Sequence, residues 1–341
     1  ARGVQGVSFA LTQHRQWAEA ERYAAEAQRR YAEVGNLIMA ADNQRMVGGC
    51  QLQSGYPQKS LATMEEALAF SRQVENLWGQ AESARFLSTI HAELGNYGEA
   101  LKMARESIIQ AQKVGEPIIT NAKTAAGFTS RAIMALDIAQ QYHLEVIAEI
   151  AGGGFNPFPD LTLSELCAVY ALAGEWTEAH EYAKQVLEFH AGGDVLPMGM
   201  AGWFVTEALL HGGDGDLARM DVEHQALVVG QNRRFRLPLL RSQAVLAQWD
   251  GNVAQAIAHL ETALALAKEI GLPGEEWPIL AALGALYVKK GEQDQAQQAY
   301  QTAKAIIGRL AGTIDASDLR ARFLAADPVR AVLDVAVATQ K

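Results

Sequence analysis

The chain has 341 residues, with 29 basic and 39 acidic side chains that give a formal net charge of −10. A single compact core rarely exceeds about 250–300 residues, so this length predicts either two domains or a repeat array, in which each unit contacts only its neighbours. The acidic excess is spread along the chain, and it argues against a nucleic-acid surface, which needs clustered Lys and Arg.

The composition favours helices, because Ala, Leu, Gln and Glu are abundant and period-two strand patterns are scarce. We find no stretch of 18 or more uncharged apolar residues and no signal-peptide pattern. Cys50 and Cys167 lie in apolar, helix-like surroundings, so we expect buried, reduced thiols and a cytoplasmic location. The start at Ala1 without a methionine suggests a fragment of a longer protein, although processing would look the same.

A small residue recurs about every 40 positions along the chain. The copies are Ala20, Ser60, Ala100, Ala179, Ala218, Ala256 and Ala296. Small or apolar residues follow most copies after four and seven positions, which is one face of a helix. The missing copy should lie near residue 140, where Gln140 is followed by Leu144 and Ile147. A small side chain at this position lets two helices approach closely.

A short turn pattern precedes the recurring small residue. Gly95, Gly174 and Gly291 each follow an apolar helical stretch and stand five residues before an alanine. Glycine ends the first helix because it adopts the left-handed conformation cheaply. Acidic residues after it favour the start of a second helix, where the helix dipole is positive. The sequence therefore predicts helix–turn–helix units.

This pattern of a large residue, Leu, a small residue and Tyr, then Gly-x-Tyr/Trp-x-x-Ala, resembles the tetratricopeptide repeat. The resemblance covers residues 1–312 and implies an all-α, right-handed α-solenoid of about eight repeats. The expected repeats lie near 1–38, 39–78, 79–117, 118–155, 156–196, 197–234, 235–274 and 275–312, and residues 313–341 form a C-terminal capping helix and tail. In that helix Leu319, Phe323 and Leu324 would face inward, with Arg320, Arg322 and Arg330 in water.

The period of about 40 residues departs from the common tetratricopeptide period of about 34. This long variant resembles the C-terminal arrays of bacterial signalling ATPases, including LuxR-type activators similar to the maltotriose-sensing regulator and ATPases linked to nucleotide cyclases. The segments Asp318–Leu324 and Asp327–Leu333 are similar to the closing segment of those arrays. The resemblance implies a fused upstream ATPase or output domain.

The motifs of common catalytic and metal sites are missing from the sequence. There is no phosphate loop, no His-Glu-x-x-His and no His–Cys set at ligand spacing, and no Gly-x-Ser-x-Gly elbow. We therefore expect a non-enzymatic protein with no catalytic residues, no metal and no cofactor. One irregular segment, 152–159, is most simply a long loop between repeats; alternatively it is a lip or hinge with Phe155 and Phe158 as contact residues.

The tetratricopeptide resemblance implies that the first helix of each pair lines a concave groove, with contacts from its second, fifth, ninth and twelfth positions. The groove candidates carried over in this way are Gln5, Phe9, Asp42, Arg45, Glu82, Arg85, Trp203, Glu207 and Arg241. Arg45 and Arg85 occupy equivalent positions, about 10 Å apart at helix-packing distance, and could grip a carboxylate or phosphate. Alternatively they pair with Asp42 and Glu82.

The resulting hypothesis is a protein-interaction and sensor module of a larger bacterial signalling ATPase, cyclase or transcription activator. It would bind a protein or peptide partner, or a small effector, in the groove and signal through the pitch of the superhelix. No direct contact with nucleic acid or membrane is expected. The alternatives are a small-molecule receptor for a sugar-like ligand and a pure assembly scaffold.

Overall fold

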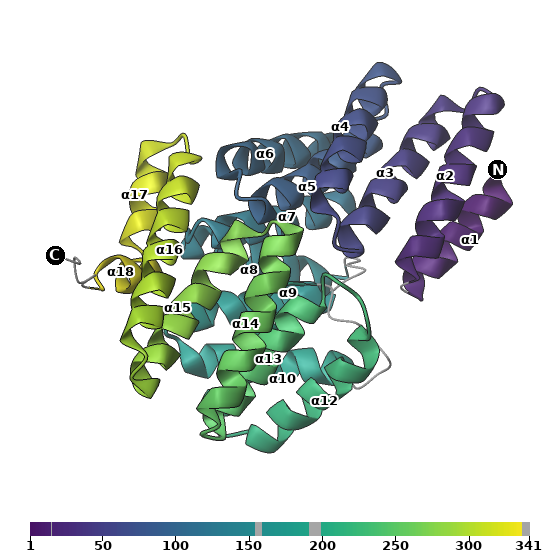
Figure 1. Ribbon diagram of the computed structural model, residues 1–341. Coiled ribbons are helices and arrows are strands. Elements are labelled where there is room, and N and C mark those ends of the chain that lie inside the picture. The colour runs from purple at the N-terminus through teal and green to yellow at the C-terminus, as the bar shows by residue number, and fades with distance from the viewer. Residues whose placement is uncertain (15, 154–158, 191–198, 336–341) are drawn as a thin grey trace.

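The computed structural model describes residues 1–341 except residues 15, 154–158, 191–198 and 336–341. The described residues form eighteen α-helices and no strand. Consecutive helices pack side by side along the chain and build a curved α-solenoid (Figure 1). The predicted all-α repeat fold is therefore confirmed.

The described helices form eight successive pairs and a C-terminal extension. The pairs are α1 (Arg2–Gln13) with α2 (Trp17–Glu33), α3 (Leu37–Gln53) with α4 (Pro57–Gln73), α5 (Leu77–Glu93) with α6 (Tyr97–Val114), α7 (Ile118–Ala132) with α8 (Leu136–Ala151), α9 (Pro159–Leu172) with α10 (Trp176–His190), α11 (Gly202–His211) with α12 (Gly215–Val229), α13 (Arg236–Trp249) with α14 (Val253–Ile270), and α15 (Pro273–Lys290) with α16 (Gln293–Gly312). The extension consists of α17 (Ser317–Ala325) and α18 (Asp327–Leu333).

The recurring small residues lie buried where the second helix of a pair meets the first. Ala20 and Ala100 have no exposed surface. Their carbonyl groups accept hydrogen bonds from Ser8 at 2.8 Å and Ser88 at 3.0 Å, both on the preceding helix. A larger side chain at these positions would push the two helices apart.

In the fourth pair the buried small residue lies one position earlier than expected. Ala139 has no exposed surface, whereas Gln140 is half-buried and donates a hydrogen bond to the Tyr170 hydroxyl at 2.9 Å. The turn before α8 also differs, because Met134 takes the left-handed conformation with φ 58°. In the three turns whose glycine was singled out from the sequence, Gly95, Gly174 and Gly291 do so with φ between 78° and 81°, as predicted.

The solenoid curls until distant pairs meet and form a ring, from which α1 and α2 project (Figure 1). The turn between α3 and α4 reaches the sixth and seventh pairs. Gln58 donates to the Ile270 carbonyl at 2.7 Å, and Asn232 donates to the Gln53 carbonyl at 3.2 Å. The concave side of the array is therefore enclosed along part of its length.

Two short helices close the C-terminal end, where the sequence predicted one capping helix. The chain breaks at Ala326, which is extended, because Pro328 in the first turn of α18 cannot continue the preceding helix. Phe323 is fully buried, and its ring meets that of Tyr97 edge-on at 5.9 Å. Leu319 and Leu324 pack against the same core, as expected, and Arg320, Arg322 and Arg330 are exposed.

The two cysteines are buried free thiols, which confirms the expectation for them. Burial raises the pKa of the Cys50 thiol to about 12, so its reactive thiolate is rare at neutral pH. No helix among the described residues combines the length and the apolar character needed to cross a membrane.

Candidate ligand-binding site

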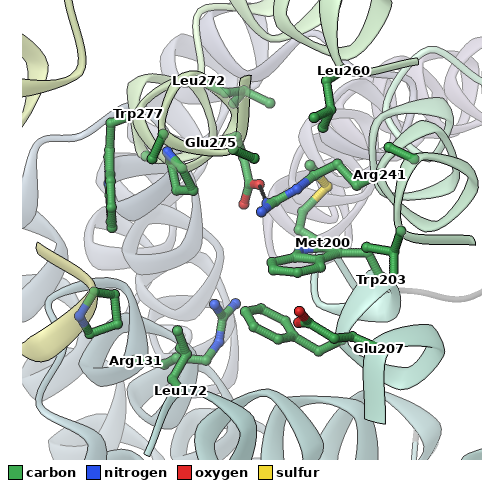
Figure 2. A pocket seen from close by; sticks show the side chains of 18 of the residues that line it. Arg131, Leu172, Met200, Trp203, Glu207, Arg241, Leu260, Leu272, Glu275 and Trp277 are labelled. Atoms are coloured by element: carbon green, nitrogen blue, oxygen red, sulfur yellow. Dashed lines mark hydrogen bonds and ion pairs between the residues drawn. The ribbon is translucent and has the colours of Figure 1, made fainter. Parts of the chain in front are cut away.

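The ring encloses a cavity of about 660 Å³ on its concave side (Figure 2). Most of its wall comes from the first helices α7, α11, α13 and α15, and Glu93 contributes from the end of α5. Cavities of roughly 300–1,000 Å³ are typical of sites for small ligands. This cavity is therefore our candidate functional site.

Aromatic and aliphatic side chains form most of the cavity wall. Trp203 and Phe204 on α11 lie with ring centroids 3.7 Å apart, and Trp277 on α15 lies across the cavity from Trp203 (Figure 2). The aliphatic lining includes Leu172, Met200, Leu260 and Leu272. Such a wall favours a ligand with an apolar or planar body.

Arg241 on α13 holds a fixed positive charge at the cavity. Its guanidinium lies 3.7 Å from the ring centroid of Trp203, and Nη1 donates to Glu275 Oε2 at 2.6 Å. Burial lowers the pKa of Arg241, and the neighbouring Glu275 carboxylate opposes that shift. Because the cation is stacked and paired, its position is set before any ligand arrives.

Arg131 on α7 places a second guanidinium at the cavity. Its Nη2 donates to Glu165 Oε1 at 3.0 Å, and Nε contacts the other carboxylate oxygen, so the pair is bidentate. Glu165 on α9 has no exposed surface, and Arg131 also lies over the Phe128 ring at 5.4 Å. This pair joins α7 to α9 at the cavity wall.

Glu207 on α11 is a largely buried carboxyl group of the inner wall. Its carboxylate points into the cavity (Figure 2). Within the described part of the chain no hydrogen bond or ion pair reaches it. Burial raises the pKa of Glu207, and the nearby charge of Arg241 opposes that rise only in part. A ligand with a cation or a hydrogen-bond donor would relieve this desolvation.

The charged residues of the wall thus include fixed Arg–Glu pairs, the Glu207 carboxylate and, at the exposed end of α15, Lys289. Helix pairs stacked in this way also have known counterparts. Residues 236–307 match the tetratricopeptide repeat family model. This match covers the seventh and eighth helix pairs, from Arg236 in α13 to Ile307 in α16. A search of the curated proteins finds no match.

Solved structures share this arrangement of helices over most of the chain. A Rap protein complexed with Competence and Sporulation Factor has a TM-score of 0.67 at 10% identity, covering 92% of this chain and 98% of that one. The Rap conjugation gene regulator of plasmid pLS20, in complex with the Phr* peptide, has a TM-score of 0.62 at 15% identity, covering 83% and 78%. The apo quorum sensor NprR from B. thuringiensis has a TM-score of 0.59 at 12% identity, covering 89% and 86%. At these identities the likeness concerns the fold.

The predicted groove residues separate into two groups in the structure. Trp203, Glu207 and Arg241 meet at the cavity. Asp42, Arg45, Glu82 and Arg85 lie together on α3 and α5. There Glu82 binds Arg85 in a bidentate pair at 3.1 and 2.9 Å, with Arg45 at 3.9 Å. Arg45 also stacks on Trp78 at 4.3 Å. Arg85 thus pairs with Glu82 as in the alternative named from the sequence, whereas Arg45 also turns to Glu82, and Asp42 accepts a hydrogen bond from Asn76 at 2.9 Å.

A smaller recess connects these two groups. It has a volume of about 80 Å³, is lined by Arg85 and Asn121, and shares Phe128 and Met200 with the wall of the main cavity. The N-terminal group therefore borders the same concave surface, beyond the main cavity.

The remaining predicted contacts lie elsewhere. Gln5 accepts a hydrogen bond from the Tyr31 hydroxyl at 2.8 Å and so ties α1 to α2. Phe9 on α1 is 56% exposed and lies outside the lining of the main cavity. Phe155 and Phe158 fall outside the described residues.

Sequence reasoning missed Trp277, Glu275 and Arg131. Trp277 is the fifth residue of α15, whereas Asp42, Glu82, Glu207 and Arg241 are each the sixth residue of their helices. Glu275 and Arg131 are the third residue of α15 and the fourteenth of α7, and these positions are outside the rule that assigned the groove candidates. They line the cavity because the ring curls tightly enough to bring helix ends inward.

Metal chemistry has no support in the described parts of the chain. No three His, Cys, Asp or Glu side chains gather there at a spacing that could hold a metal ion. The cavity therefore offers shape, aromatic faces and charge as its means of recognising a ligand.

Proposed function

We propose that this chain is a non-enzymatic sensor module that binds a short peptide in its central cavity. The observation that carries the proposal is the cavity itself, with a volume of about 660 Å³, aromatic walls, and Glu207 facing inward between fixed Arg–Glu pairs. Two proteins of similar fold supply support, since one is complexed with Competence and Sporulation Factor and the other with the Phr* peptide.

The wall chemistry favours a particular kind of peptide. Trp277 offers an apolar aromatic surface, Trp203 is stacked between the Phe204 ring and the Arg241 guanidinium, and the charges of Arg131 and Arg241 are already matched by carboxylates. Glu207 has no such match among the described residues. The best ligand is therefore a peptide with apolar side chains and one basic group that reaches Glu207.

The cellular setting is part of the same proposal. The long repeat period and the tail resemblance support a place in the C-terminal part of a larger bacterial signalling ATPase, cyclase or transcription activator in the cytoplasm. The bound peptide would then change the pitch of the superhelix and, through it, the contact with the output domain.

Binding of a pool of random pentapeptides, sorted into basic, neutral and acidic classes, tests the proposal by calorimetry and by the shift in melting temperature. We expect the basic class to bind best. Glu207→Gln keeps the shape of the side chain but removes its charge, so it should weaken binding of the basic class about tenfold or more, because a hydrogen bond to a charged group contributes roughly 1.5–3 kcal/mol.

The matched control for this variant is Glu188→Gln, which makes the same change on the exposed surface of α10. It should leave the affinity of all three classes unchanged. Equal binding of the three classes, or equal weakening by both variants, would contradict the role of Glu207. Absence of binding by every class would contradict the peptide-sensor function.

The alternative of a small-molecule receptor is favoured by the aromatic lining of the cavity, because aromatic side chains such as Trp277 also suit a sugar-like ligand. A thermal-shift screen with metabolites separates it from the peptide sensor. A pure scaffold would bind neither kind of ligand and would form stable assemblies in light scattering.

A further inference from the structure

The ring is closed by a set of contacts that join residues far apart in the chain. We call this set the clasp, and it consists of the ion pair Glu93–Arg234 and the contacts of Thr313 with Gly95, Tyr97 and Gly98. The turn between α5 and α6 contributes one side. The other side comes from the segments before α13 and after α16.

Glu93 and Arg234 form the buried part of the clasp. Their side chains are 4% and 6% exposed and are 141 residues apart in sequence. Arg234 Nη1 donates to Glu93 Oε2 at 2.6 Å, and Nη2 contacts the other carboxylate oxygen. Buried ions are held only by such partners, so separation of the two sides would leave both charges to be hydrated.

Thr313 supplies the hydrogen-bonded part of the clasp. The amide of Tyr97 donates to the Thr313 hydroxyl at 3.2 Å, and the amide of Gly98 donates to the Thr313 carbonyl at 2.9 Å. These amides belong to the first turn of α6, where helical N–H groups have no partner within their own helix. Their protection from solvent therefore depends on contact across the clasp.

The clasp is also part of the cavity wall. Glu93 and Tyr97 line the cavity on one side of it, and Leu272 and Glu275 of the last helix pair line the other. Separating the two sides would open this wall. In a repeat array each unit is stabilised by its neighbours, so the ring can open at the clasp while the helix pairs stay folded.

We propose that the clasp is the gate of the ligand cavity: the ring opens between the α5–α6 turn and Thr313 to admit a ligand, and a ligand touching both sides holds it closed. This inference rests on the proposed function, because it describes the regulation of the same cavity. Ligand and closure favour one another, since a ligand that contacts both sides binds the closed ring better than the open one.

Gly98→Ala tests whether the clasp opens as a unit. The added Cβ would lie 2.7 Å from the Thr313 carbonyl oxygen and 2.9 Å from an Asp315 carboxylate oxygen, which forces the two sides apart. In a helix, Gly→Ala alone is stabilising, so any opening must come from the clasp. We expect hydrogen exchange of the Tyr97 amide to rise at least tenfold while amides of α9 and α10 keep their rates.

The control is Gly308→Ala in α16, where the added Cβ meets nothing within 4 Å. It should leave Tyr97 exchange as in the unmodified protein. Glu93→Gln serves as a second opening variant, because it removes the charge that holds Arg234. Unchanged Tyr97 exchange in both opening variants would overturn the proposal, as would an equal rise throughout α9 and α10, which indicates global unfolding.

Coupling to the ligand is measured on the unmodified protein with the basic pentapeptide pool as the probe. We expect bound peptide to slow Tyr97 exchange, and Gly98→Ala to weaken the binding. Peptide that binds without slowing this exchange would overturn the gate and leave the peptide-sensor function intact. If the peptide pool does not bind, the peptide-sensor function is contradicted, and the gate, which depends on that function, is contradicted as well.

Discussion

Replacing Glu165 with alanine is expected to lower the free energy of unfolding by about 3–5 kcal/mol, because it leaves the guanidinium of Arg131 without its partner at a buried position. Glu165 has no exposed surface, and Arg131 is 11% exposed. Burial would lower the pKa of Arg131, but Glu165 outweighs this effect and raises it. Urea denaturation followed by circular dichroism measures the loss.

A double-mutant cycle separates the interaction energy of Arg131 and Glu165 from the effect of each substitution by itself. Arg131→Met and Glu165→Leu should each be about as damaging as Glu165→Ala, whereas the double variant Arg131→Met/Glu165→Leu should recover most of the loss, because apolar residues of similar volume often replace a buried ion pair at little cost. The control is Asp250→Ala, which breaks the bidentate but exposed Arg219–Asp250 pair and should change stability far less. Additive losses in the cycle would contradict this account.

The second large effect is a loss of stability in acid caused by His143. This residue on α8 has no exposed surface, and among the described residues neither ring nitrogen has a hydrogen-bond partner. Burial lowers the pKa of His143 to about 3, and the charge of Arg131 adds to the shift. Gly127 leaves the space that the ring occupies, since a Cβ there would lie 2.5 Å from Nε2.

The sign of the effect follows from which state binds the proton. Above pH 6.5, the ordinary histidine pKa, both folded and unfolded chains hold His143 neutral. As the pH falls toward 3, only the unfolded chain binds the proton, so stability declines by up to about 1.4 kcal/mol per pH unit. Between pH 7 and pH 5 we expect His143 to lower the free energy of unfolding by about 2 kcal/mol.

His143→Leu should remove this part of the pH dependence, measured as the difference in unfolding free energy between the variant and the unmodified protein from pH 7 to pH 5. His190 titrates in the opposite sense: burial opposes its charged form, but Asp160 and Asp221 raise its pKa to about 9. Its contribution is common to both proteins and cancels. Gln112→Leu, an exposed change on α6, is the control. Parallel pH curves for unmodified protein and His143→Leu would contradict the prediction.

The repeat was predictable because its signals are local. A glycine such as Gly95 ends one helix, and a small residue such as Ala100 lets the next helix pack closely against it. Both recur at a nearly fixed spacing that is visible in a single sequence. The fourth pair shows where this reasoning weakens. Met134 replaces the glycine there, and the buried Ala139 stands one position from the expected one.

Part of the candidate site could also be predicted, because the positions of a repeat that face inward are set by helix geometry. Trp203, Glu207 and Arg241 were placed on the concave side in this way, and they line the cavity. Arg131 and Glu275 could not be predicted from the sequence, because the curvature of the whole array brings their side chains to the cavity.

The sequence by itself determined the all-α repeat array, since helix periodicity, turn glycines and small anchors act over a few residues. Only the tertiary structure decided that the array closes into a ring around a cavity. Closure depends on small rotations between units that accumulate over many repeats, and it joins partners such as Glu93 and Arg234 across 141 residues. No local pattern encodes such a pairing, because neither residue needs the other to form its own helix.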